Sequence, residues 1–203
     1  MKTIDFFYSI GSRYSYLAST QIGTLKQDFN CQVLWHPVDS VTLIEKSGIS
    51  PFEGKPVSGQ YEWTYRKLDA QRWAEFYDVP YREPRGRVKF DSELLARACT
   101  AAKHWAKEEE YSHLLFKAMF EDSLSQIDEP ECVVRAEACS ILPADFQSQL
   151  QATETTSQLN ATIDRALNAG VFGVPAFIVS GKLFWGNDRI VLLRHYLTTT
   201  VNK

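Results

Sequence analysis

Two hydroxyl side chains, Ser12 and Ser15, stand three residues apart in the stretch YSIGSRYSYL, residues 8–17. An apolar run precedes them and a helical pattern follows, which places the pair where a strand gives way to a helix. Two cysteines at this spacing would exchange disulfides, and serines cannot. A serine here can cap the helix, and the unpaired amides of the first turn can receive an anion. Local sequence alone favours Ser12 as the cap, although Ser9 could take that role and Ser15 could simply lie in the first turn.

Two C-terminal segments are the other candidates for a ligand site. In VFGVPAF, residues 171–177, a trans Val174–Pro175 bond is the common case, whereas a cis bond would turn the Val174 amide and carbonyl toward an extended, peptide-like ligand. In FWGNDR, residues 184–189, Gly186 permits a tight turn. Asn187 or Asp188 could then cap the next helix, or the two could hold the ammonium or carboxylate end of a ligand. The local sequence leaves these alternatives open.

The elements that must position these residues can be read from apolar spacing. The segments KTIDFFYS, residues 2–9, and CQVLWHPV, residues 31–38, predict strands, and helical spacing predicts one helix from Tyr14 to about Phe29 between them. A strand, a helix and a strand in succession indicate a parallel pair with a right-handed crossover. Near the C-terminus we expect a strand, a tight turn at Ser180–Gly181, a second strand, and a helix that begins near Asn187.

The middle of the chain predicts helices. A loop rich in Gly and Pro, residues 47–59, is followed by four helical segments with almost no strand signal. A further helix, Leu159–Ala169, should end at Gly170. We therefore predict an α/β fold in which residues 1–40 and 155–203 form a discontinuous domain around a four-stranded mixed sheet, and residues 41–154 form an all-helical insertion. The four segments are Tyr61–Tyr77, Asp91–Lys107, Tyr111–Asp122 and Glu131–Ile141.

Composition argues against several classes of function. The chain has 203 residues, a net charge of −3 and a pI of about 5.8, which does not indicate a nucleic-acid partner. The basic cluster of residues 82–89 is short, and we interpret it as a solvated loop. No apolar run approaches the roughly 20 residues that span a bilayer, so no membrane association is expected. Asp5 interrupts the N-terminal apolar run, which argues against a signal peptide.

The cysteines and histidines show no metal-ligand spacing. We expect no metal site, and we expect the cysteines to be small buried residues in a reducing cytosol. The four cysteines are Cys31, Cys99, Cys132 and Cys139, and the four histidines are His36, His104, His113 and His195.

Four segments together resemble the 2-hydroxychromene-2-carboxylate isomerases, a family grouped with the kappa-class glutathione transferases and the DsbA-like thiol oxidases. The segments are IGSRYSYLA at 10–18, VLWHPV at 33–38, YRKLDAQRWAEFYDVPY at 65–81 and GVFGVPAFIVSGKLFWGNDR at 170–189. The resemblance covers essentially the whole chain, although the central helices match only in composition. It implies a thioredoxin-like fold, a cytoplasmic enzyme, glutathione as cofactor and a possible homodimer.

The resemblance also implies roles for particular residues. Ser12 falls where the family places the serine that hydrogen-bonds the glutathione sulfur. Val174 and Pro175 match the valine–cis-proline pair whose backbone holds the cysteinyl part of glutathione. Asn187 and Asp188 match the pair that holds its γ-glutamyl end. These roles replace the local interpretations of Ser12 as a cap and of Pro175 as trans.

The chain departs from the family pattern at two positions. Arg13 stands where proline is common, and it brings a cation that could stabilise a thiolate or an anionic substrate. Ile49 stands where relatives commonly have an asparagine that contacts glutathione, so one cofactor contact is expected to be weaker. An aromatic acid would need apolar walls and a cation, for which Arg13 or Arg66 is available. The candidate walls are Trp35, Trp63, Trp73, Phe184 and Trp185, with core packing favoured for Trp35 and Trp73.

A pocket that has no cysteine thiol of its own can accept the thiol of a cofactor. The implied reaction is reversible addition of the glutathione thiolate to an unsaturated aromatic keto acid, followed by bond rotation and elimination. In the family it interconverts 2-hydroxychromene-2-carboxylate and trans-o-hydroxybenzylidenepyruvate during aromatic catabolism. Two alternatives stay open: a kappa-like transferase that releases the adduct, and a non-catalytic module that binds glutathione or a peptide.

Overall fold

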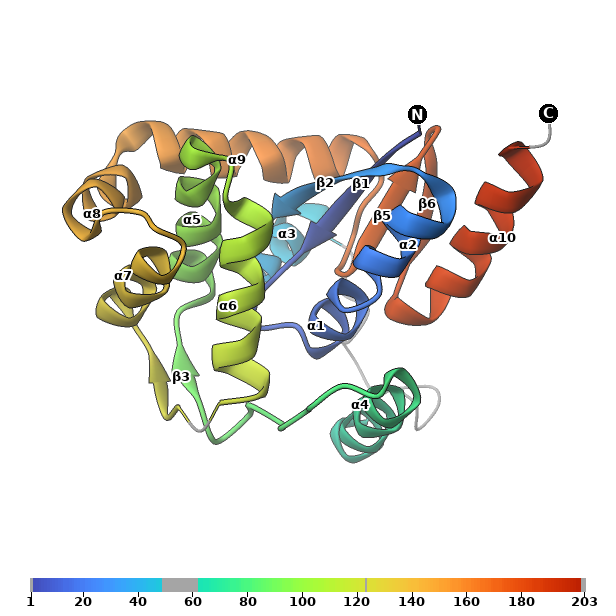
Figure 1. The fold of residues 1–203 in the computed structure, drawn as a ribbon, viewed down its shortest axis with the longest axis horizontal. Coiled ribbons are helices and arrows are strands. Elements are labelled where there is room, and N and C mark those ends of the chain that lie inside the picture. Colours follow the sequence, from blue (N-terminus) through green and yellow to red (C-terminus); the bar gives the residue numbers. More distant parts are fainter. Residues whose placement is uncertain (1, 49–61, 123, 202–203) are drawn as a thin grey trace.

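The computed structural model describes residues 2–48, 62–122 and 124–201 (Figure 1). Its main sheet has four strands in the order β2-β1-β5-β6. Strands β1 and β2 are parallel, whereas β5 is antiparallel to both β1 and β6, so the predicted mixed sheet is confirmed. The strands are β1 (Thr3–Tyr8), β2 (Gln32–Pro37), β5 (Ala176–Val179) and β6 (Lys182–Trp185).

Helices cover both faces of this sheet because β1 is apolar on both sides. Side chains alternate along a strand, so Ile4, Phe6 and Tyr8 enter one hydrophobic cluster and Phe7 enters the other. Helices α1 (Arg13–Ser19), α2 (Ile22–Phe29) and α10 (Ile190–Val201) pack on the first face. Helices α3 (Ser40–Ser47) and α9 (Thr153–Asn168) pack on the second. The end of β1 that leads into α1 thus lies between two covered faces.

The single helix predicted over Tyr14–Phe29 is wrong, because the chain forms two helices there. Thr20 Oγ1 donates to the carbonyl of Leu17 at 2.7 Å, and the Gln21 amide donates to that of Ala18 at 3.1 Å. These bonds reach back three residues, which tightens the last turn and ends α1. The apolar spacing continues across the break, so periodicity alone could not reveal it.

The predicted helical block is confirmed, with shifted ends and additional elements. Helix α8 was missed because only Phe146 and Leu150 of its residues are buried, which leaves a weak apolar pattern. Helix α3 was missed for the same reason, with Leu43 its only buried residue. The two-residue strands β3 and β4 pair in parallel and are too short to show alternation. The block contains α4 (Trp63–Tyr77), β3 (Lys89–Phe90), α5 (Ser92–Ala102), a 3-10 turn (Lys103–Trp105), α6 (Glu108–Phe120), β4 (Gln126–Ile127), α7 (Glu129–Ala138) and α8 (Pro143–Gln151).

One part of the solvated-loop interpretation is wrong. The half-buried Arg87 donates to the carbonyls of Met119, Asp122 and Leu124 at 2.6, 2.9 and 3.2 Å. It therefore joins the loop before β3 to the end of α6. Three donated hydrogen bonds satisfy most of a guanidinium group, which explains why this cation tolerates partial burial.

Three smaller expectations are confirmed: the tight turn of the C-terminal hairpin, the glycine after α9 and the burial of the cysteines. Ser180 and Gly181 both have positive φ, 49° and 73°, as the tight turn between β5 and β6 requires. Gly170 follows α9 with a φ of 79°. All four cysteines are buried and unpaired. Within the described ranges, no helix combines the length and the apolar character needed to cross a membrane. The proposed division into two domains stays a prediction.

Candidate active site

Ser12 lies at the N-cap of α1, four residues after the end of β1 at Tyr8. Its Oγ accepts a hydrogen bond from the Ser15 amide at 3.2 Å, and its backbone is extended, with φ −90° and ψ 114°. Ser12 therefore caps α1, and the expectation that a role in glutathione binding replaces the cap is wrong. The hydroxyl proton takes no part in this bond, and no acceptor for it lies among the described residues. One side chain can cap the helix and still donate to a ligand.

The Val174–Pro175 bond is cis, as the resemblance implies. The Pro175 carbonyl accepts from the Gly186 amide at 2.9 Å, which ties the start of β5 to the end of β6. Among the described residues, neither the amide nor the carbonyl of Val174 has a backbone partner. This short edge is thus available to an extended ligand.

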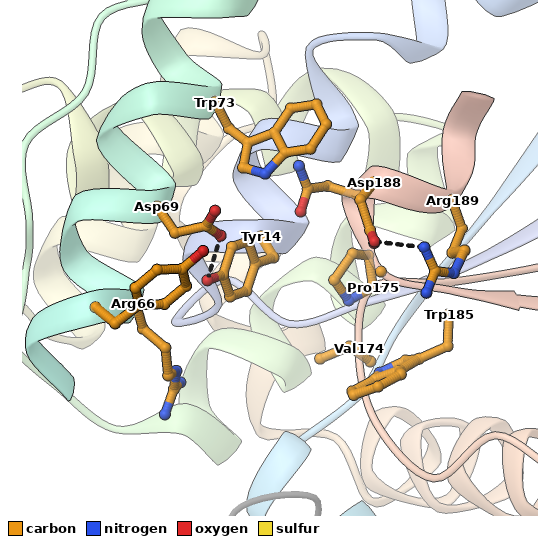
Figure 2. A pocket seen from close by; sticks show the side chains of 12 residues that line it. Tyr14, Arg66, Asp69, Trp73, Val174, Pro175, Trp185, Asp188 and Arg189 are labelled. Atoms are coloured by element: carbon orange, nitrogen blue, oxygen red, sulfur yellow. Dashed lines mark hydrogen bonds and ion pairs between the residues drawn. The ribbon is translucent and has the colours of Figure 1, made fainter. Parts of the chain in front are cut away.

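Two adjoining cavities meet at Val174. The larger measures about 360 Å³ and is lined by Pro175, Asn187 and Asp188 (Figure 2). The smaller measures about 170 Å³ and is lined by Ser12. The structure therefore brings all five predicted site residues to one place, with Ser12 in a separate compartment from the Asn–Asp pair. The two cavities share Tyr14, Arg66, Val174 and Trp185.

Asn187 and Asp188 follow a glycine that the backbone requires. Gly186 has a φ of 110°, and a Cβ at this position would collide with Oδ1 of Asp188. The Asn187 side chain is 3% exposed, and its Nδ2 has no partner within the described structure. The carboxylate of Asp188 pairs with Arg189 at 2.6 Å. Asn187 lines the larger cavity, and its unpartnered amide is a donor that suits a ligand oxygen.

A residue pair that sequence reasoning missed joins α1 to α4 across the larger cavity. The Tyr14 hydroxyl donates to Oδ2 of Asp69 at 2.9 Å (Figure 2). Burial, and next the hydrogen bond to Asp69, raise the pKa of Tyr14 well above its ordinary value. Tyr14 therefore stays protonated and fixes Asp69. The two residues are 55 positions apart, and only the fold brings them together.

The aromatic candidates separate into core and cavity residues. Trp35 is 2% exposed and packs edge-on against Phe6 and Tyr8 in the core, as favoured. Core packing alone does not describe Trp73, because it also lines the larger cavity. Trp185 lines both cavities, whereas Phe184 packs against Tyr196 of α10. Ile49 lies outside the described residues.

A cationic wall stands beside Ser12. Arg13 pairs with Glu83 at 3.3 Å, and its guanidinium carbon lies 4.0 Å from the centre of the Trp63 ring. The Arg85 guanidinium lies 3.8 Å from the same centre. Burial, and next the charge of Arg13, lower the pKa of Arg66. This site therefore combines apolar walls with a local excess of positive charge.

Comparisons with known proteins agree with this geometry. A model of the DSBA-like thioredoxin domain matches residues 3–198. The 2-hydroxychromene-2-carboxylate isomerase of Pseudomonas sp. (strain C18) is 24% identical over 193 residues, which is 95% of this chain and 88% of that protein. Glutathione S-transferase kappa 1 of Homo sapiens is 25% identical over 212 residues, which is 97% of this chain and 91% of that protein.

A solved structure of a 2-hydroxychromene-2-carboxylate isomerase has the same fold. It superposes with a TM-score of 0.80 at 22% identity, and the match covers 98% of this chain and 96% of that one. The thioredoxin-like fold expected from the sequence is thereby confirmed.

Proposed function

The chain belongs to the family of DSBA-like thioredoxin domains, and from this membership we propose that it is a glutathione-dependent isomerase of 2-hydroxychromene-2-carboxylate-type aromatic keto acids. One observation carries the proposal. The position next to α1 that would hold a thiol in a disulfide exchanger holds the Ser12 hydroxyl, and its proton has no acceptor among the described residues. Such a site suits a thiol supplied by a cofactor.

The residues present fit glutathione. Its backbone would pair with the amide and carbonyl of Val174 beside Pro175, and its γ-glutamyl end would meet Asn187 and Asp188 in the larger cavity. The unpartnered Nδ2 of Asn187 supports this assignment, because a buried donor without a partner is costly unless a ligand satisfies it. The kinship with a kappa-class glutathione transferase gives further support.

The chain's own groups hold and activate the cofactor. When bound, glutathione supplies a thiolate that adds reversibly to an electron-poor carbon of the substrate. The Ser12 hydroxyl donates to the sulfur and favours its ionised form. The Ser15 amide holds Ser12 in the orientation that allows this donation. Trp185, which lines both cavities, shields the reacting atoms from water.

The first experiment mixes the protein with 2-hydroxychromene-2-carboxylate and follows the ultraviolet spectrum with and without glutathione. Conversion to the open-chain pyruvate only in the presence of glutathione would support the proposal. No spectral change in either condition would exclude the named substrate. A product that retains sulfur would identify the second candidate, a kappa-like transferase, which the human relative favours.

We infer a cytoplasmic setting for this activity. The four buried, unpaired cysteines and the dependence on glutathione both fit a reducing compartment. A homodimer stays a prediction, which light scattering coupled to size-exclusion chromatography would test.

A further inference from the structure

Arg13 is a buried cation next to Ser12, and one of its terminal nitrogens has no hydrogen-bond partner among the described residues. It is 8% exposed and lines the smaller cavity together with Ser12. Its Nη2 donates to Glu83 Oε1 at 3.3 Å, whereas its Nη1 is buried without a partner among the described residues. The Trp63 ring lies 4.0 Å from the guanidinium carbon and leaves the group little freedom to turn away. The Arg13 guanidinium is therefore held in place while its Nη1 has no hydrogen-bond partner among the described residues.

The one carboxylate on this guanidinium is already shared. Glu83 Oε1 also accepts from the Arg85 amide at 3.2 Å, and its Oε2 accepts from the Tyr81 hydroxyl at 2.7 Å. Its single charge is thus shared among the Arg13 guanidinium, the Arg85 amide and the Tyr81 hydroxyl. The positive charge of Arg13 also acts on Arg66, which lines the same cavity. Asp69, a carboxylate of the adjoining larger cavity, accepts a hydrogen bond from Tyr14.

The rest of the smaller cavity suits a flat, apolar body. Ile44 and Trp185 contribute apolar surface, and Gly173 lets the Trp185 ring approach the backbone closely. A Cβ on Gly173 would lie 2.9 Å from the indole nitrogen of Trp185, so this approach depends on the glycine. The cavity thus offers an apolar wall, the Ser12 hydroxyl and the Arg13 guanidinium within about 170 Å³.

We propose that Arg13 binds the carboxylate of the substrate in the smaller cavity and makes the site selective for acidic electrophiles over neutral ones of the same shape. The inference rests on the proposed function and adds the residue that makes the site selective for a negatively charged substrate. A guanidinium group binds a carboxylate through directed, charge-assisted hydrogen bonds. Glu83 and Trp63 act as positioning residues, since they hold the Arg13 guanidinium while its Nη1 has no partner among the described residues.

The test compares an unsaturated aromatic keto acid with its methyl ester as substrates at saturating glutathione. Arg13→Met keeps the length of the side chain and its packing on Trp63 but removes the donors. We expect KM for the acid to rise about 10- to 100-fold, with KM for the ester within about twofold of wild type. Arg13→Lys should recover part of the preference, because it restores the charge without the fork. Equal changes for acid and ester, or no change for either, would overturn the proposal.

Arg85→Ala is the matched control. Arg85 contacts the same Trp63 ring, yet it is exposed and does not line the smaller cavity. Its removal should leave the preference for the acid unchanged. If Arg85→Ala abolished the preference as fully as Arg13→Met, the general charge of the wall would be responsible, and the specific role of Arg13 would be refuted.

A binding measurement separates this inference from the proposed function and from misfolding. Titration of cinnamate and of cinnamamide into the wild type and into folded Arg13→Met needs no turnover. A wild-type preference for cinnamate that Arg13→Met loses supports the inference even if no isomerisation is found, which would count against the proposed function alone. If Arg13→Met does not fold, the wild-type comparison decides, because equal affinities for the two probes would refute an anion site. Glutathione affinity should be unchanged in Arg13→Met, and its loss would also contradict the proposal.

Discussion

The Ser15 amide donates to Ser12 Oγ at 3.2 Å, and this bond uses an acceptor site of the hydroxyl while leaving its proton available. A serine can therefore end a helix and present a donor at the same time. A thiol is a weaker acceptor and a weaker donor, so it would do either task less well. The bond connects the stability of α1 with the chemistry proposed for the site.

This relationship predicts that substitutions of Ser12 separate into two effects. Ser12→Ala should lower the free energy of unfolding by about 1 kcal/mol through loss of the cap. It should also lower turnover at saturating glutathione about 10- to 100-fold through loss of the hydrogen bond to the sulfur. Ser12→Asp should restore the cap but not the turnover, because a carboxylate can accept from the Ser15 amide yet repels a thiolate. Denaturant unfolding and initial rates measure the two effects.

Ser19→Ala is the control for both substitutions. Ser19 is also buried in α1, but its hydroxyl donates to the Tyr16 carbonyl at the opposite end of the helix. Its loss should not affect turnover. Normal turnover in Ser12→Ala would remove Ser12 from the mechanism.

The second prediction concerns stability at high pH. Burial raises the pKa of Tyr14, and the hydrogen bond to the Asp69 carboxylate raises it further. The folded chain therefore keeps the Tyr14 proton at pH values where the unfolded chain, with a pKa near 10, releases it. Stability that is complete below pH 10 should fall as the pH rises further. Urea unfolding between pH 9 and 11 should show this slope, and Tyr14→Phe should reduce it. An unchanged slope in Tyr14→Phe would contradict the assignment.

Sequence patterns predicted the sheet and singled out the three candidate segments, because both depend on local signals, whereas the ligand roles of the site residues came from the family resemblance and stay predictions. The strands are dense in apolar residues, and the Ser12, Val174–Pro175 and Asn187–Asp188 segments each sit beside a strand end. The Tyr14–Asp69 bond and the Arg13–Glu83 pair were out of reach, because the partners are 55 and 70 positions apart. The break between α1 and α2 was hidden by apolar spacing that continues through it. Contacts of this kind arise only from tertiary packing.

The third prediction concerns stability at low pH. His36 Nε2 lies 2.8 Å from Asp5 Oδ1, yet burial outweighs this contact and lowers the pKa of His36 to about 4. Asp5 also pairs with Arg165 at 2.7 Å, so the Asp5 carboxylate stabilises a protonated His36 less strongly. The depressed pKa gives stability that is present above the unfolded value of about 6.5 and is lost as the pH falls toward 4.

The size of this effect can be measured by urea unfolding. Between pH 7 and pH 5 the titration of His36 should reduce the free energy of unfolding by about 2 kcal/mol. His36→Gln cannot titrate, so its loss over the same interval should be smaller by about that amount. His195→Gln is a suitable control, since His195 is exposed on α10. An equal loss in wild type and His36→Gln would show that folding does not lower the pKa of His36.

The final prediction uses two glycines of the same hairpin region, Gly181 and Gly186. Both have positive φ, 73° and 110°, so alanine strains the backbone at either position and should cost on the order of 1 kcal/mol or more of stability. Only at Gly186 would the new Cβ strike Asp188, whereas at Gly181 it meets nothing within 4 Å. Gly186→Ala should therefore move the Asp188 carboxylate out of its place in the larger cavity and raise the Kd for glutathione about 10-fold.

Gly181→Ala should lower the midpoint of thermal unfolding and leave that Kd within about twofold of wild type. Isothermal titration of glutathione into both folded variants makes the comparison. If both lost affinity equally, general destabilisation of the hairpin would explain the result. If neither lost affinity, the turn that carries Asn187 and Asp188 would not be where glutathione binds. Loss in Gly186→Ala alone assigns the γ-glutamyl end to this turn, because the two variants share the strain and differ in the collision with Asp188.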